Sequence, residues 1–224
     1  MPPVTKNLII INILMFLTTF VAESWGINLN YYLGLHFFLN DSFQVYQPLT
    51  YIFMHGGLSH LFFNMFALWM FGRILENVWG SKNFLIYFLI CGIGAGVVQE
   101  IVQYVSINMD ISSFEQARGL ALSSYDRAMV YSRIPSTVGA SGSVYGILLA
   151  FGMMFPNEKL FIIPFPFPIK AKFFVIGYAI IELVTGLSNN PNDNVAHFAH
   201  LGGMLFGLIL ILYWRKKKHN GPTY

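Results

Sequence analysis

Six long apolar runs divide this chain and constrain its fold more than any other feature. Hydrophobic residues make up 55% of the sequence and charged residues 10%, whereas soluble domains carry about 25% charged residues. A helix needs about 20 apolar residues to cross a bilayer, and the runs approach or exceed this length. They cover residues 8–22, 48–71, 83–105, 141–155, 173–187 and 195–214.

The runs predict an all-α membrane protein rather than an ordinary cytosolic enzyme. Backbone groups inside a bilayer need internal partners, so spanning segments are helices or closed barrels, and these runs lack the alternation of barrel strands. We therefore expect residues 1–224 to form a single domain, a bundle of six transmembrane helices. The segment Met1–Asn7 is short and weakly charged for a signal peptide, so the first run is expected to be retained.

Two segments between the runs have a distinct composition. Residues 23–47 contain no Lys or Arg and combine aromatic side chains with Asn and Asp, which indicates an interfacial first loop lying on the membrane. In residues 106–137, Ser112 and Glu115 have the spacing of a capping box, which predicts a peripheral helix after them. Neither segment is expected to cross the bilayer.

The basic residues predict the orientation of the bundle. Cytoplasmic loops are enriched in Lys and Arg, and six spans put both termini on one side. If that side is the cytoplasm, it holds ten of the thirteen basic residues, Lys6, Arg73, Lys82, Lys159, Lys170, Lys172, Arg215, Lys216, Lys217 and Lys218. The other side holds Arg118, Arg127 and Arg133. We expect a protein of a bacterial inner membrane with both termini in the cytoplasm. No nucleic-acid partner is expected, because basic residues dispersed between spans form no binding face.

Three runs carry polar residues at a similar depth. In this orientation the second, fourth and sixth runs all enter from the outer side. His60 and Asn64 lie partway into the second, Ser141 at the mouth of the fourth, and His200 one to two turns into the sixth. Polar side chains inside a membrane usually face the bundle interior or a wet cavity. This convergence favours a shared polar site that opens outward.

Glycines offer a way for these residues to meet. Two runs carry glycines four residues apart, Gly142 with Gly146 and Gly203 with Gly207. Such spacing clears one helix face of side chains and permits close backbone approach. If the two faces oppose each other, Ser141 and His200 come within hydrogen-bond reach.

A serine beside a histidine is typical of nucleophilic catalysis. Imidazole titrates near neutral pH and can take a hydroxyl proton, so Ser141 is a candidate nucleophile and His200 a candidate base. Unpaired N–H groups at the start of a helix can stabilise an oxyanion, and His60 and Asn64 are candidate side-chain donors to it. No Asp lies in any run, which predicts a Ser-His dyad. Tyr145, one turn after Ser141, can orient the His200 ring by stacking or be an ordinary buried aromatic.

The sequence favours neither a metal nor a cofactor. Four histidines lie in or near the runs, His55, His60, His197 and His200. No His-Glu-x-x-His motif is present, and no carboxylate or thiolate is expected beside these histidines. Glu182 in the fifth run requires a partner or a proton, and a structural contact with an unidentified partner is expected. The single cysteine, Cys91, is expected to be a small core residue.

The motifs together resemble those of the rhomboid family of intramembrane serine proteases. The resemblance extends over about residues 48–207 and rests on Gly139-Ala140-Ser141-Gly142 followed by Tyr145, His60-x-x-x-Asn64, Gly72-x-x-x-Glu76-x-x-x-Gly80-Ser81 and Ala199-His200-x-x-Gly203-x-x-x-Gly207. The family pattern places Gly three residues after the histidine, which selects His200 over His197 as the base.

The resemblance implies a six-helix bundle with a water-filled site that cleaves transmembrane segments of other membrane proteins. It makes Ser141 the nucleophile, His200 the general base, and His60, Asn64 and the Ser141 N–H the oxyanion hole. The supporting residues are Gly139, Gly142, Tyr145, Gly203 and Gly207. It also implies that residues 188–194 and the outer end of the fifth run form the substrate gate. The expected partners are transmembrane substrates and the lipid bilayer.

Two other functions compete with this interpretation. An inactive rhomboid-like protein that binds transmembrane clients need not keep a nucleophile and a base, and this chain has both. A small transporter would show repeated halves, and no repeat relates residues 1–105 to residues 138–214. The physiological substrate, the oligomeric state and the role of residues 106–137 stay open.

Overall fold

Helices make up nearly all of the regular structure in the computed structural model, which describes residues 1–161, 167–188 and 195–219. The elements in chain order are α1 (Pro3–Ser24), α2 (Leu29–Leu33), α3 (Gln47–Thr50), η1 (Tyr51–Phe53), α4 (Leu58–Ala67), η2 (Leu68–Gly72), α5 (Arg73–Trp79), α6 (Ser81–Arg118), α7 (Ser124–Ser132), α8 (Ser141–Met154), β1 (Lys159–Leu160), β2 (Ile169–Lys170), α9 (Ala171–Leu187) and α10 (His197–His219). The strands β1 and β2 form a short antiparallel hairpin between α8 and α9.

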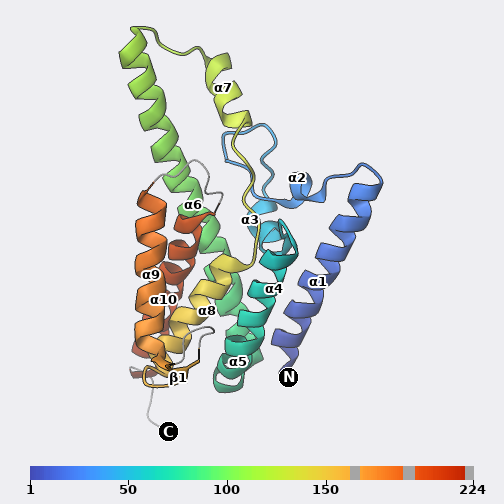
Figure 1. Ribbon diagram of the computed structural model, residues 1–224, viewed down its shortest axis with the longest axis vertical. Helices are drawn as coiled ribbons and strands as arrows, with labels where there is room; N and C mark the ends of the chain where they lie inside the picture. Colours follow the sequence, from blue (N-terminus) through green and yellow to red (C-terminus); the bar gives the residue numbers. More distant parts are fainter. Residues whose placement is uncertain (162–166, 189–194, 220–224) are drawn as a thin grey trace.

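Helices α6, α8 and α10 pack against one another and form the centre of the bundle (Figure 1). Helix α9 covers α8 and α10 on one side, and α1 lies against α4 and η2 on the other. Helix α1 begins and α10 ends at the lower end of Figure 1, whereas α6 projects past the bundle at the upper end. The first and last helices therefore meet the same end of the bundle.

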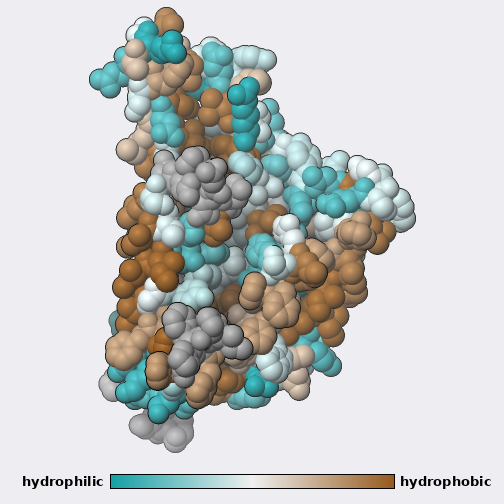
Figure 2. Space-filling model, viewed as in Figure 1, coloured by the Kyte–Doolittle hydropathy of each residue, from teal (hydrophilic) through white to brown (hydrophobic). Residues whose placement is uncertain are grey.

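The fold and its surface confirm the prediction of an all-α, multi-pass membrane protein. Among the described residues, four helical segments are long and apolar enough to cross a bilayer, Pro3–Ser24, Leu58–Trp79, Ser81–Arg118 and His197–Lys217. Their outward faces expose large apolar side chains. Figure 2 shows brown, hydrophobic residues along the sides of the bundle and teal, hydrophilic residues at its lower end and on the projecting upper part. Lipid is the solvent that such a surface requires.

The second span differs from the predicted residues 48–71. Its continuous helix begins at Leu58 and runs to Trp79, while residues 48–57 form α3, η1 and a turn that contains Gly56 and Gly57. Residues 72–82, which separate the second and third predicted runs, are helical apart from Gly80, which has a φ of +78°. Residues 73–79 contain no Gly or Pro, so the helix continues through them.

Glu76 joins this helix to the first one. Its carboxylate accepts hydrogen bonds from the Val4 and Thr5 backbone N–H groups at 2.9 and 2.7 Å, and from the Ser81 hydroxyl at 2.7 Å. The end of the second span is thereby tied to the N-terminal turn of α1.

The third span is longer than the predicted residues 83–105, and the peripheral helix starts later than predicted. No Gly or Pro interrupts residues 97–118, so α6 continues to Arg118, and Gly119, with a φ of +65°, ends it. Ser112 and Glu115 therefore lie inside α6. The capping box that starts the peripheral helix α7 is formed by Ser123 and Asp126.

The fourth span is short, and its shortness places Ser141 inside the bundle. Helix α8 has 14 residues and is about 21 Å long, compared with about 30 Å for the hydrocarbon core. Its C-terminal end lies at the lower end of the bundle (Figure 1). The N-terminal residue, Ser141, is therefore recessed from the upper boundary of the bilayer.

The first loop contacts the segment that leads to Ser141. Leu35 forms an antiparallel bridge with Thr137 through two backbone hydrogen bonds of 2.9 and 2.8 Å. The buried Gln47 side chain bonds several backbone groups of the loop, including the N–H of His36 at 3.2 Å. Helix α2 gives the loop regular structure that the composition of residues 23–47 did not predict.

Candidate active site

Ser141 begins α8 after a turn that only glycine adopts readily. Gly139 has a φ of +132°, and an added Cβ would lie 2.7 Å from the His60 ring. A glycine at this position therefore allows both the turn and the approach of His60. Because Ser141 is the first residue of the helix, it lies beside N–H groups that have no intrahelical partner and at the positive end of the helix dipole.

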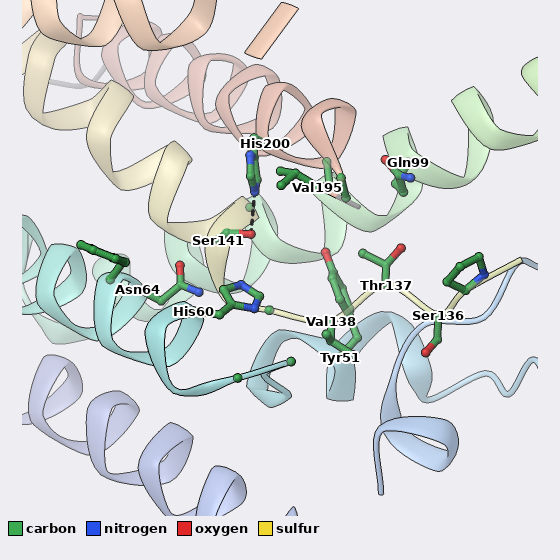
Figure 3. A pocket seen from close by; sticks show the side chains of 18 of the residues that line it. Tyr51, His60, Asn64, Gln99, Ser136, Thr137, Val138, Ser141, Val195 and His200 are labelled. Carbon is green, nitrogen blue, oxygen red and sulfur yellow. Dashed lines mark hydrogen bonds between the residues drawn. The ribbon is translucent and has the colours of Figure 1, made fainter. Parts of the chain in front are cut away.

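Close contact between α8 and α10 brings His200 to Ser141. An added Cβ on Gly203 would overlap with the Gly142 carbonyl group, so the two backbones touch at this point. The Ser141 Oγ lies 2.8 Å from the His200 Nε2 (Figure 3). This distance is that of a hydrogen bond through which a hydroxyl can pass its proton to an imidazole.

The other two glycines make the same kind of contact with α6. An added Cβ on Gly146 would lie 2.5 Å from the Cys91 sulfur, and one on Gly207 would overlap with the Tyr87 hydroxyl. Cys91 is buried in the core, as predicted from its apolar surroundings. The glycine faces of α8 and α10 therefore oppose each other and also pack on α6.

Two side chains, one aromatic and one acidic, hold the His200 ring. The Tyr145 ring stacks on the His200 ring with centroids 4.2 Å apart and an interplanar angle of 6°. The Glu182 Oε2 lies 2.9 Å from the His200 Nδ1, the nitrogen that faces away from Ser141. The Tyr145 hydroxyl donates a hydrogen bond to the other Glu182 oxygen.

Glu182 is the residue of this site whose role the sequence missed. The absence of Asp from the runs predicted a Ser-His dyad. In the structure, Glu182 contacts the His200 nitrogen on the side opposite to Ser141, so that the three side chains follow one another. The structure also identifies the partners of Glu182 as Tyr145, His200 and His197, whose Nδ1 lies 2.6 Å from Oε2. The signal was present in the sequence, because an intramembrane carboxylate requires polar partners.

The expectation that no carboxylate lies beside the histidines is wrong, because Glu182 lies beside two of them. Glu182, His197 and His200 offer ligand atoms that all lie within 4.8 Å of one another. Both histidines turn their Nδ1 atoms to the carboxylate at hydrogen-bond distance. Hydrogen bonding alone accounts for this arrangement.

A cavity of about 860 Å³ opens in front of Ser141 and His200. His60 and Asn64 line it from α4, and Tyr51 and Gln99 line it from other elements (Figure 3). The Asn64 Nδ2 is buried and has no hydrogen-bond partner among the described residues. The amide projects toward the side where Ser141 lies (Figure 3). A donor left unpaired beside a cavity is available to a ligand.

Two other polar residues, His55 and Ser143, lie near the site. His55 is buried, and its ring centroid lies 5.1 Å from that of His60. The Ser143 hydroxyl donates to the Phe88 carbonyl at 2.7 Å and points away from His200. Of the residues assigned to the substrate gate, 189–194 lie outside the described residues.

Comparison with known proteins finds similarity to one protein family. Residues 42–217 match the Rhomboid domain family. The chain is 30% identical over 178 residues to the presenilin-associated rhomboid-like protein A, mitochondrial, of Danio rerio, a match that covers 74% of this chain and 38% of that protein. It is 31% identical over 163 residues to the rhomboid protease GluP of Bacillus subtilis (strain 168), covering 72% of this chain and 24% of that protein.

A plant relative extends over more of the chain. Rhomboid-like protein 11, chloroplastic, of Arabidopsis thaliana is 27% identical over 207 residues, which cover 83% of this chain and 61% of that protein. The matched region is thus less than two thirds of each of these relatives.

Proposed function

The chain belongs to the rhomboid family, and from this premise we propose that it is an active intramembrane serine endopeptidase. The observation that carries the proposal is the 2.8 Å contact between the Ser141 Oγ and the His200 Nε2 at the edge of a cavity inside an apolar bundle. The catalytic residues are Ser141 as nucleophile and His200 as general base.

In the proposed reaction, the Ser141 Oγ forms a bond to the carbonyl carbon of the scissile peptide. His200 accepts the hydroxyl proton on Nε2, and the carbonyl oxygen becomes an oxyanion. The Ser141 N–H, the Asn64 Nδ2 and the His60 ring stabilise this oxyanion, and each such donor typically contributes roughly 3–4 kcal/mol to catalysis. His200 then protonates the leaving amine as the C–N bond breaks, and a water hydrolyses the acyl-enzyme by the same sequence of steps.

The proposed substrates are transmembrane segments of other proteins. Ser141 is recessed within a bundle whose sides are apolar, so a soluble peptide would not reach it as readily as a segment that enters from the lipid. A helix must unwind to expose a peptide bond, and polar side chains that line the cavity, such as Gln99 and Gln103, can bond the freed backbone groups. The proposal requires no metal or cofactor.

The protein is a multi-pass membrane protein, and we further propose a bacterial inner membrane with cytoplasmic termini and the cavity open to the outer side. The support is the distribution of Lys and Arg, since ten of the thirteen lie on the side of the bundle that carries both termini. The relatives include proteins named as mitochondrial and chloroplastic, so the orientation calls for its own measurement.

The test is cleavage of a helical membrane substrate by the protein reconstituted in proteoliposomes. We expect the wild type to cleave it and Ser141→Ala to lose cleavage while keeping its thermal stability. Ser143→Ala is the matched control, because Ser143 points away from the cavity and should retain cleavage. Full cleavage by Ser141→Ala would contradict the proposal, and client binding without cleavage by the wild type would favour an inactive rhomboid-like protein.

A further inference from the structure

We propose that Glu182 is a positioning residue that holds His200 in the tautomer and orientation needed to accept the Ser141 proton. The inference rests on the proposed function and adds a third residue to the proposed pair of Ser141 and His200. Glu182 acts through His200, since its carboxylate contacts the ring nitrogen that lies away from Ser141.

The two contacts of the His200 ring determine the tautomer. The Nδ1 lies 2.9 Å from the Glu182 Oε2, and the Nε2 lies 2.8 Å from the Ser141 Oγ. A neutral imidazole carries a proton on one nitrogen and a lone pair on the other, and an ionised carboxylate can only accept. Glu182 therefore selects the Nδ1–H form, which leaves the Nε2 lone pair directed at the Ser141 hydroxyl.

The surroundings of Glu182 are those of an ionised carboxylate. Its exposed fraction is 5%, and burial of a charge is costly unless hydrogen bonds compensate it. Within the described residues, the carboxylate contacts the Tyr145 hydroxyl on one oxygen and the Nδ1 atoms of His197 and His200 on the other. Each of these groups can donate a hydrogen bond to it.

The same carboxylate stabilises the state that follows proton transfer. When His200 takes the Ser141 proton, the ring becomes a cation in a site where it is only 8% exposed. A neighbouring anion offsets the cost of that charge, and it does so more strongly in a buried site than in water. Tyr145 contributes to both contacts, because it stacks on the ring and donates to Glu182.

A purely structural role is the competing explanation, because Glu182 also links α9 to α10. The two roles differ in what they change. A structural link sets how many molecules are folded, whereas a positioning residue sets how fast each folded molecule reacts. A covalent serine probe separates the two quantities, since the final extent of labelling counts folded sites and the rate constant reports their reactivity.

The experiment measures labelling of the full chain in detergent by a fluorophosphonate probe, for the wild type and Glu182→Gln. Glutamine keeps the shape of the side chain and removes its charge. We expect the rate constant to fall by about 10²-fold, a smaller loss than the roughly 10⁴-fold decrease in kcat when the acidic member of a Ser-His-Asp triad is neutralised, with the final extent of labelling unchanged. Glu100→Gln is the matched control, because it neutralises a partly buried carboxylate that bonds the Phe38 N–H and not His200, and it should leave the rate unchanged.

Two further variants complete the test. In the His200→Ala background, Glu182→Gln should not lower the residual rate any further, because Glu182 acts through His200. If Glu182→Gln does not fold, Glu182→Asp keeps the charge but withdraws it by one methylene, and it should slow labelling to a smaller degree.

Three results would overturn the inference while leaving the proposed function intact. These are a wild-type rate constant in Glu182→Gln, an equal further loss in the His200→Ala background, and an unchanged rate in Glu182→Asp. A wild type that the probe does not label at all contradicts the proposed function itself, and the inference with it.

Discussion

At the scale of single residues, the proposed chemistry depends on how firmly a few side chains are held. The Ser141 Oγ and the His200 Nε2 lie 2.8 Å apart, and Tyr145 lies flat against the His200 ring. The Asn64 Nδ2 lacks a partner among the described residues, although it is buried. Tyr145 and Asn64 can therefore be tested separately, Tyr145 for its effect on the base and Asn64 for its effect on the oxyanion.

Substitution of Tyr145 should separate ring stacking from hydrogen bonding. Tyr145→Phe keeps the stacked ring and loses only the bond to Glu182, so we expect a decrease of a few fold in the rate of fluorophosphonate labelling. Tyr145→Ala removes both contacts and should slow labelling by a further factor of about 10, since aromatic pairs contribute roughly 0.5–1.5 kcal/mol. Equal rates for the two variants would contradict the role of stacking.

Substitution of Asn64 tests the proposed oxyanion donor. Asn64→Ala should lower kcat for substrate cleavage by about 10²-fold with little change in KM, because the oxyanion exists only along the reaction path. Steady-state kinetics in proteoliposomes give both constants, and a thermal melt checks the fold. An unchanged kcat in folded Asn64→Ala would exclude Asn64 from the oxyanion hole.

At the scale of secondary-structure elements, the site exists because three helices approach one another at glycines. The backbone of α10 touches that of α8 where Gly203 faces Gly142, and both helices pack on α6. Helix α8 is also short, which recesses its first residue from the upper boundary of the bilayer. The position of Ser141 thus depends on the spacing of helices as much as on the residues around it.

A methyl group at the α8–α10 contact should therefore disrupt both stability and activity. Gly203→Ala introduces a Cβ that overlaps with the Gly142 carbonyl group, and we expect a loss of about 1–3 kcal/mol of stability, as is typical of overpacking, together with slower probe labelling. Gly177→Ala on α9 is the control, since its added Cβ would meet no atom within 4 Å. Tolerance of Gly203→Ala, with an unchanged melting temperature and rate, would contradict close packing at this point.

At the scale of the whole molecule, hydropathy and charge explain most of what could be predicted. The six apolar runs, residues 8–22 through 195–214, each contain a helix, and the polar residues of three of them line one cavity. The helix ends were less predictable. The start at Leu58 and the extension of α6 to Arg118 depend on where glycine permits a turn, and the spacing of Ser112 and Glu115 was misleading for that reason.

The contacts of Glu182 could not be read from the sequence. Sequence spacing relates residues on one helix, but Glu182 and His200 lie on α9 and α10, and their meeting depends on how the two helices are rotated against each other. The same limit applies to the bridge between Leu35 and Thr137. Contacts between distant elements require the packed fold.

The proposed orientation can be measured in intact cells. A cysteine introduced at the start of α7, next to the projecting end of α6, by Tyr125→Cys should react with a membrane-impermeant maleimide added outside. A cysteine at the other end of the bundle, Lys217→Cys, should react only after the membrane is permeabilised. Cys91 is buried, so the native thiol should contribute little background. The reverse pattern would contradict the orientation inferred from the basic residues.

The central claim is that Ser141, activated by His200, is a reactive nucleophile, and labelling by a fluorophosphonate probe tests it most directly. We expect the purified wild type to carry the label on the peptide that contains Ser141, and we expect neither Ser141→Ala nor His200→Ala to be labelled at a comparable rate. An unlabelled wild type, or a label that persists in Ser141→Ala, would contradict the account.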